Sequence, residues 1–316
     1  MKHTPESLAH RVIRSAADWS SAGQMLVKFL ASRFTYRSEP EWRQRIASGE
    51  ITVNGKAADP EYRLAMHDII EYRPGDLPEP EANCDYKIVY EDDALLVIDK
   101  PANLCVHPSG PFFRHTLWHL LSSRYGEIHL VNRLDRETSG LMLAAKDPQT
   151  AAKLARPGYP INKEYLALVF GTFDHPVDAA GFLVPDRLSA VRKKRKFVPE
   201  DSPEAKNGES CRTILVPEKC GGRFTLVRAI LETGRMHQIR ATLFSLGFPL
   251  VGDKLYGPDE TIFLKLRDNL VSDADREKLI LDRQALHSAR LAFRHPVDGR
   301  ELEFSTEPDF RSFPLD

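Results

Sequence analysis

The stretch VNRLDRETSGL, from Val131 to Leu141, holds one carboxylate, Asp135, between Arg133 and Arg136. Apolar residues precede the acid and a Thr-Ser-Gly turn follows it, which is typical of a strand that enters a tight turn. In a strand, residues 133 and 135 point to one face, so a guanidinium beside the acid would favour its charged form. Spacing alone favours a solvated surface charge, and the rest of the chain has to decide between these two interpretations.

The composition is that of a globular protein without an overall charge bias. The chain has 316 residues, of which 42% are hydrophobic, enough for a packed core and for two domains. Lys and Arg number 44 against 45 Asp and Glu, so only local clusters can indicate a polyanionic partner. The four cysteines form no CxxC pair, which disfavours disulfides and a thiolate zinc site. With no signal-peptide pattern and no long apolar run, we expect a cytoplasmic protein that does not enter a membrane.

A proline-rich segment divides the chain. The sequence RPGDLPEPEANCD, residues 73–85, contains almost no apolar side chains and is typical of a linker. We therefore predict a first domain over residues 1–75, a linker over 76–85 and a second domain over 86–316.

The apolar pattern differs on the two sides of this linker. Residues 18–73 show two helical segments, over 22–34 and 39–50, followed by an Asn54-Gly55 hairpin turn and a short strand. In the second domain, strands outnumber helices and do not alternate with them, which indicates an α+β fold. The predicted elements there are two strands within 87–101, helices over 115–126 and 234–247, and strands at 164–171, 223–232, 285–293 and 301–305.

Two basic clusters are candidates for binding an anion. In GRMHQIR, the predicted helix places His237 and Arg240 on one face, with Arg235 at its start. An amphipathic surface helix is the simpler interpretation, but the apolar residues that follow indicate burial, and a buried arginine requires an anionic partner. The second cluster is a run of five cations, which fits a solvated loop and a phosphate contact equally well. It consists of Arg192, Lys193, Lys194, Arg195 and Lys196.

Motifs for bound metals and cofactors are weak or absent in the sequence. His115 and His119 have the i, i+4 spacing of a metal-binding pair, but no third ligand is evident. The chain has no GxSxG elbow, no GxxxxGK[ST] loop and no GxGxxG motif, so hydrolase, nucleotide and dinucleotide functions have no support. We expect neither a metal nor a cofactor.

Five segments, taken in order, resemble the RluA-type RNA pseudouridine synthases over about residues 85–316. Five ordered matches are far more specific than any one of them. The resemblance implies an α+β pseudouridine synthase fold, with a central, mostly antiparallel sheet flanked by helices and loops. The matching segments are VYEDDALLVIDKPANLCVHPSG (89–110), NRLDRETSGLMLAAKD (132–147), KEYLALVFG (163–171), GRMHQIRATLFSLGFPLVGDKLYG (234–257) and QALHSARLAFRHP (284–296).

The first domain resembles the small α/β RNA-binding module named after ribosomal protein S-four. Residues 42–73, WRQRIASGEITVNGKAADPEYRLAMHDIIEYR, show its helix, its VNG hairpin and its closing strand. The resemblance implies that Arg43 and Arg45 face RNA. The match is short and rests mostly on hydrophobic spacing and one turn.

The resemblance to the synthases implies isomerisation of uridine within RNA and gives a role to each candidate residue. Asp135 is the catalytic aspartate, Arg240 pairs with it and keeps it ionised, and Tyr165 lies against the flipped base. Asp135 either traps the sugar or removes a sugar proton, and the sequence does not choose between these routes.

The same resemblance assigns residues to RNA binding. Arg133 fills the space that the extruded uridine leaves, Arg136 makes a backbone or surface contact, and the five cations at 192–196 clamp the RNA backbone. One position departs from the family, whose HRLD motif is here NRLD with Asn132 in place of the histidine. The contact of that histidine is therefore in question.

Two other functions remain open on the sequence. The fold can serve an RNA-binding protein without chemistry, such as a ribosome-assembly factor. A glycoside hydrolase would require a second carboxylate, for which Glu137 is the candidate. For the synthase, we expect large-subunit ribosomal RNA as the partner, with transfer RNA second, and a monomer.

Overall fold

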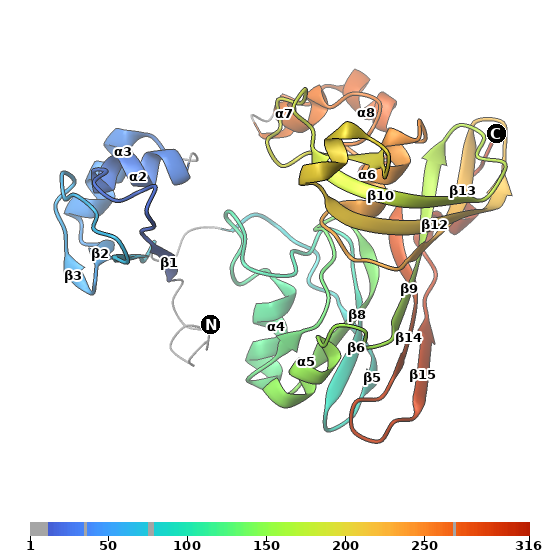
Figure 1. The fold of residues 1–316 in the computed structure, drawn as a ribbon, viewed down its shortest axis with the longest axis horizontal. Coiled ribbons are helices and arrows are strands. Elements are labelled where there is room, and N and C mark those ends of the chain that lie inside the picture. The colour runs from blue at the N-terminus through green and yellow to red at the C-terminus, as the bar shows by residue number, and fades with distance from the viewer. Residues whose placement is uncertain (1–11, 35–36, 75–78, 268–269) are drawn as a thin grey trace. The chain divides into compact units, whose positions relative to one another are not determined.

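The chain divides into two units between Pro80 and Glu81 (Figure 1). The computed structural model describes residues 12–34, 37–74, 79–267 and 270–316. Each unit has its own hydrophobic core.

The first unit is a four-stranded antiparallel sheet with two helices, in the strand order β1-β4-β2-β3. Its core buries apolar side chains of both helices, including Leu30 and Trp42. Asn54 and Gly55 have positive φ in the turn between β2 and β3, so the predicted hairpin is confirmed, as are both helices. Strand β1 was missed because IRSA shows no apolar alternation. The elements are β1 (Ile13–Ala16), α2 (Leu26–Arg33), α3 (Glu39–Ala47), β2 (Ile51–Val53), β3 (Lys56–Ala57) and β4 (Ile69–Tyr72).

The second unit is built on a sheet that has eleven strands within the described residues. The order is β11-β10-β12-β13-β9-β14-β8-β6-β5, with β15 beside β14 and β7 beside β8. All pairs are antiparallel except β14 with β8, so the predicted α+β fold with a mostly antiparallel sheet is confirmed. The strands are β5 (Lys87–Glu91), β6 (Leu95–Lys100), β7 (His129–Leu130), β8 (Ser139–Ala145), β9 (Ile161–Phe170), β10 (Val177–Pro185), β11 (Arg195–Pro199), β12 (Glu209–Cys220), β13 (Phe224–Leu231), β14 (Leu286–Arg294) and β15 (Glu301–Ser305).

Strand β9 lies between β13 and β14 and sorts its side chains between the two faces of the sheet. Tyr165 and Ala167 face the largest core, to which α4 and α6 also contribute. Leu166 and Leu168 face the opposite core. This alternation has the period of two that a strand imposes, and it places Tyr165 on the same face of the sheet as α6. The helices are α4 (Leu117–Tyr125), α5 (Pro148–Leu154), α6 (Gln238–Ser245), α7 (Thr261–Arg267) and α8 (Asp273–Leu279), with short 3-10 turns at Pro203–Asn207 and Asp309–Ser312.

Helix α6 begins later than the sequence predicted. His237, immediately before it, has a left-handed backbone with φ of 60°. The prediction that Arg235 and His237 belong to this helix is therefore wrong. Gln238 stabilises the preceding loop, because its Oε1 accepts from the Arg235 N–H at 3.0 Å and its Nε2 donates to the Arg212 carbonyl on β12 at 3.0 Å.

Gly140 is required where β8 meets β14. Its φ is 104°, and a Cβ at this position would lie 2.3 Å from the carbonyl oxygen of Ser288. Only glycine therefore permits the parallel pairing of the two strands, in which Gly140 lies opposite Ser288. This close approach holds the start of β8, where the loop carrying Asp135 ends.

Candidate active site

Asp135 lies in a loop between β7 and β8, so the prediction of a strand through residues 133–135 is wrong. Leu134 anchors this loop because its side chain is buried in the largest core. On the other side of Asp135, the Thr138 hydroxyl accepts a hydrogen bond of 2.5 Å from Nε2 of Gln284. The loop is thus held before and after Asp135, whose side chain is 29% exposed.

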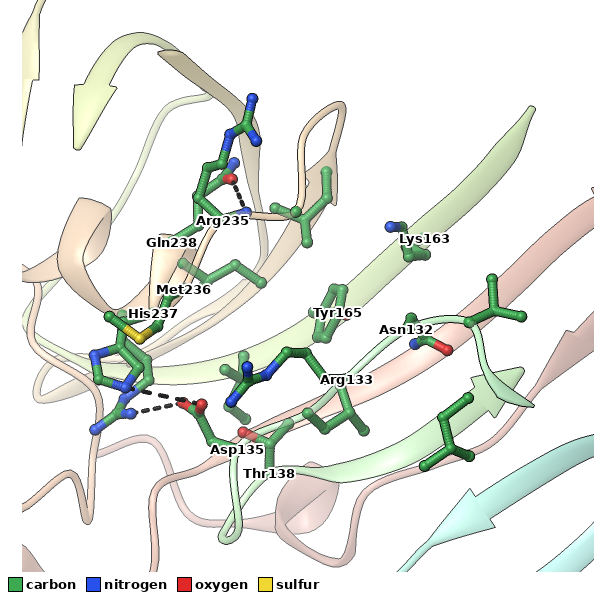
Figure 2. A pocket seen from close by; sticks show the side chains of 18 of the residues that line it. Asn132, Arg133, Asp135, Thr138, Lys163, Tyr165, Arg235, Met236, His237 and Gln238 are labelled. Atoms are coloured by element: carbon green, nitrogen blue, oxygen red, sulfur yellow. Dashed lines mark hydrogen bonds and ion pairs between the residues drawn. The ribbon is translucent and has the colours of Figure 1, made fainter. Parts of the chain in front are cut away.

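The carboxylate of Asp135 opens into a pocket with a volume of about 470 Å³. Asp135, Tyr165 and Arg240, the three predicted catalytic residues, all line it. Figure 2 shows Asp135 with its partners at one end of the view and Lys163 and Asn132 at the other, with Tyr165 and Arg133 between them. The pocket therefore brings together the motifs around residues 135, 165 and 240, which are far apart in the sequence.

Arg240 connects two carboxylates. Its Nη1 donates to Oδ2 of Asp135 at 2.6 Å, and its Nε and Nη2 donate to Oδ2 and Oδ1 of Asp253 at 2.6 and 2.8 Å. Asp253 is fully buried and also accepts the backbone N–H groups of Leu255 and Tyr256. The bidentate pair with Asp253 fixes the plane of the guanidinium, and the remaining nitrogen points at Asp135.

The electrostatics keep Asp135 ionised. Burial alone would raise the pKa of Asp135, but the charge of Arg240 and the hydrogen bond that it donates outweigh this effect, so the pKa lies below the ordinary value. Burial and the charge of Arg240 lower the pKa of His237 to about 4, so this imidazole is neutral at physiological pH. The interpretation of Asp135 as a solvated surface charge is therefore wrong.

The hydrogen bonds of Tyr256 favour one tautomer of His237. The Tyr256 hydroxyl oxygen accepts from the Arg195 N–H at 2.9 Å, and its own proton can donate to Nδ1 of His237, which lies 3.0 Å away. A neutral imidazole that accepts at Nδ1 carries its proton on Nε2. Nε2 lies 3.9 Å from Oδ1 of Asp135, so a second N–H group is directed towards the carboxylate.

Tyr165 forms part of the pocket wall. It is 6% exposed, and burial raises the pKa of its hydroxyl to about 12. The phenol is therefore protonated at physiological pH, and its ring is available to an occupant of the pocket.

The charged residues next to Asp135 in the sequence, Arg133, Arg136 and Glu137, make different contacts. Arg133 is exposed at the pocket, and no ion pair is found for it in the described structure. The Arg136 guanidinium lies 5.6 Å from the centre of the Phe112 ring and 3.4 Å from Glu137. Glu137 binds Lys254 through both oxygens, at 2.9 and 2.8 Å, and does not line the pocket. This ion pair leaves Glu137 without support as the second carboxylate of a hydrolase.

The five cations at residues 192–196 do not form one exposed loop. Arg192 and Lys193 are exposed in a turn, whereas Lys194 is only 4% exposed and binds Glu260 at 2.6 Å. The prediction of an RNA contact is therefore wrong for Lys194. Arg195 and Lys196 begin strand β11 and lie 3.9 and 2.7 Å from acidic partners, Glu209 and Glu204.

In the first unit, both candidate arginines have carboxylate partners. Arg43 pairs with Glu39 at 3.1 Å and with Glu61, and Arg45 pairs with Glu50 at 2.7 Å. These exposed or partly exposed pairs are weak and can exchange for phosphate. Binding of RNA by Arg43 and Arg45 stays a prediction.

Several residues of the site were not predicted from the sequence. Asp253 could have been found, because a buried arginine requires an anion and Asp253 is 13 residues from Arg240 in the matched segment. Tyr256 and Lys163 gave no signal of their own. The described residues contain no group of three His, Cys, Asp or Glu side chains that could hold a metal, so His115 and His119 gain no third ligand there.

Known proteins resemble this chain in sequence and in fold. The sequence model of the family described as RNA pseudouridylate synthase matches residues 94–245, which include Asp135, Tyr165 and Arg240. "Ribosomal large subunit pseudouridine synthase D" of Zymomonas mobilis is 32% identical over 303 residues, 90% of each chain. The chain belongs to the RluA-type RNA pseudouridine synthases.

Two further similarities support membership of this synthase family. The "tRNA pseudouridine(32) synthase, mitochondrial" of Saccharomyces cerevisiae is 30% identical over 74% of this chain and 51% of that protein. The structure of "Human RNA Pseudouridylate Synthase Domain Containing 1" superposes with a TM-score of 0.57 at 25% identity, covering 76% of this chain and 89% of that one. The chain is thus an RNA pseudouridine isomerase by family. No helix in the described part of the chain is long and apolar enough to span a membrane.

Proposed function

We propose that this synthase isomerises specific uridines in structured RNA, with large-subunit ribosomal RNA as its substrate and Asp135 as the catalytic carboxylate. The observation that carries the proposal is an aspartate held ionised by Arg240 at a pocket that contains an aromatic wall. The name of the Zymomonas relative supports ribosomal RNA, and the name of the yeast relative makes transfer RNA the second candidate.

The proposed reaction needs no cofactor because its atoms balance within the substrate. The bond between C1′ of the ribose and N1 of uracil breaks, the base turns, and a bond forms between C1′ and C5. The proton on C5 leaves and N1 gains a proton. Cleavage builds positive character on the sugar, which an ionised carboxylate stabilises. In this scheme Oδ2 of Asp135 remains with Arg240, and Oδ1 acts on the sugar.

Tyr165 and Arg133 act on the base and on the helix that it leaves. A uridine within a helix has to be extruded, at a cost of a few kcal/mol. The exposed Arg133 enters the vacated space, and the ring of Tyr165 stacks against the uracil, a contact worth about 1–3 kcal/mol.

Two separate surfaces bind the RNA backbone in this proposal. Arg192 and Lys193 present their charges in an exposed turn, and Arg195 and Lys196 extend that surface along β11. The first unit acts as an S-four-like module, with Arg43 and Arg45 exchanging their carboxylate partners for phosphates.

Two chemical routes are compatible with a carboxylate at the sugar, and one substitution in the substrate distinguishes them. Asp135 either bonds to C1′ or removes the proton from C2′. Deuterium at C2′ slows the reaction substantially only if this carbon–hydrogen bond breaks. A substantially slowed rate with deuterated uridine therefore assigns the proton-removal route.

Pseudouridine mapping in cells tests the function and the substrate together. Total RNA is compared between a strain that lacks this protein and the same strain complemented with wild type or with Asp135→Asn. We expect one or a few uridines of large-subunit ribosomal RNA to lose modification and only wild type to restore it. If transfer RNA sites change instead, the ribosomal assignment is wrong, and if no site changes, the enzymatic proposal is wrong and binding without chemistry takes its place.

A further inference from the structure

Lys163 is a cation in the pocket to which the reaction gives no role. It lies on β9 two residues before Tyr165, and the alternation of the strand directs both side chains to the same face. No ion pair or hydrogen bond of its ammonium group is found within the described residues. Burial lowers the pKa of Lys163, and no neighbouring charge contributes to the shift. The adjacent Glu164 points to the other face, where Arg228 and Arg290 bind it.

Asn132 lines the same pocket, and its side-chain amide has a donor without a partner. Its Oδ1 accepts the backbone N–H of Leu143 at 2.8 Å, which fixes the orientation of the amide. Its Nδ2 is buried and has no hydrogen-bond partner. Figure 2 shows Asn132 and Lys163 at the same end of the pocket, away from Asp135.

Groups of this kind favour a ligand with acceptor oxygens. A half-buried ammonium without a counterion and a buried N–H without an acceptor each destabilise the unliganded protein. Uracil is neutral, whereas the phosphate on either side of a nucleotide is an anion with several acceptor oxygens. Gly234 lies beside Lys163 in the pocket wall, where a Cβ would come within ordinary contact distance, 3.6 Å, of the ammonium nitrogen.

We propose that Lys163 and Asn132 form a subsite for a phosphate of the RNA backbone next to the target uridine. Lys163 supplies the charge and Nδ2 of Asn132 a hydrogen bond, while Asp135 acts on the ribose at the other end of the pocket. The subsite gives Asn132, which replaces the histidine of the family motif, a function of its own. The inference rests on the proposed function, since it assumes that RNA enters this pocket.

The salt dependence of RNA binding tests the subsite. Unmodified transcripts of large-subunit ribosomal RNA and of transfer RNA are titrated with the full chain at several salt concentrations. A lost phosphate contact lowers the slope of log Kd against log salt by about 0.7 for single-stranded RNA. For Lys163→Met we expect this decrease and a Kd raised about 10-fold. Lys163→Arg keeps the charge and should keep the slope. Lys219→Met, an exposed lysine outside the pocket, is the matched control and should leave both quantities unchanged.

Asn132→Asp tests the second half of the subsite. The substitution keeps an oxygen for the Leu143 N–H, removes the Nδ2 donor and adds a negative charge, so RNA affinity should fall while folding is preserved. An unchanged slope in Lys163→Met, or unchanged affinity in Asn132→Asp, overturns the subsite when the wild type forms pseudouridine in the same transcript. A wild type that forms none in either transcript instead refutes the proposed function.

Discussion

The loop at residues 133–137 and the segment at residues 192–196 are both rich in charged residues, but the charged side chains of the two segments differ in their burial and in their partners. In the loop, Asp135 reaches a pocket and an arginine, while Glu137 is bound by a lysine elsewhere. In the segment, Lys194 is buried against Glu260, and Arg192 and Lys193 remain exposed. Neighbouring charges in a sequence therefore do not share a function, because each side chain follows the direction of its own backbone and the partner that it meets.

The largest expected effect separates the two carboxylates of the loop. Asp135→Asn removes the charge at the sugar and should lower kcat at least about 10³-fold. Glu137→Gln should lower kcat less than about 10-fold, because the Glu137 side chain binds Lys254 and does not line the pocket. Single-turnover rates of pseudouridine formation measure both. Similar losses in the two variants would contradict the assignment of Asp135.

The second largest effect should be on the pH dependence of kcat, because the charge of Arg240 keeps Asp135 ionised. In the wild type the lowered pKa keeps Asp135 ionised, so kcat should be flat from about pH 5 to about pH 8 and decline only as the pH falls through that lowered pKa. In Arg240→Gln, burial is no longer offset and the pKa of Asp135 rises, so activity should be lost at higher pH than in the wild type. This variant also leaves Asp253 buried without a cation, at a cost of about 3–5 kcal/mol in unfolding free energy.

Arg240→Lys controls for folding in this experiment. It retains a cation, so kcat should decline at the same low pH as in the wild type. The value of kcat itself should be lower, because the bidentate contact to Asp253 is lost. If kcat of Arg240→Gln declines at the same pH as kcat of the wild type, Arg240 does not set the ionisation of Asp135.

A smaller effect should separate the two arginines that flank Asp135. Arg133→Ala should reduce kcat/KM about 10- to 100-fold on structured RNA. Without the arginine in the vacated space, the cost of extruding the uridine, a few kcal/mol, is no longer offset. On an unstructured oligonucleotide the loss should be much smaller. Arg136→Ala, which removes a contact with Phe112, should show no such dependence on RNA structure. Equal losses on both RNAs for Arg133→Ala would argue against its role in extrusion.

The smallest effect should distinguish Lys194 from Arg192 within the segment at residues 192–196. Lys194→Met breaks the bond to Glu260 and should lower the unfolding free energy by about 1–3 kcal/mol in urea denaturation. Arg192→Gln should change it by less than about 0.5 kcal/mol but weaken RNA binding and its salt dependence. If Lys194→Met changes RNA affinity without changing stability, the burial of Lys194 has been misinterpreted.

Much of the fold could be predicted because the signals are local. Alternating apolar residues predicted β9 and β14, Asn54-Gly55 predicted the hairpin, and Gly126 marked the end of α4. The loop of Asp135 and the late start of α6 could not be predicted, since a left-handed residue at His237 leaves no trace in hydrophobic periodicity. Strand β1 was missed for the same reason, because its four residues show no alternation.

For the site, the amino-acid sequence alone predicts which chemical groups are present: an aspartate, a tyrosine and an arginine in ordered motifs, with the arginine in a buried segment where it requires an anion. The three-dimensional arrangement adds that Arg240 joins Asp135 to Asp253, that Glu137 and Lys194 form ion pairs elsewhere, and that Lys163 enters the pocket unpaired. The physical reason is the range of each effect. Helix and strand periodicity depend on neighbours a few residues away, whereas Asp135 and Arg240 are 105 residues apart and meet only through the register of the sheet and the packing of α6 upon it.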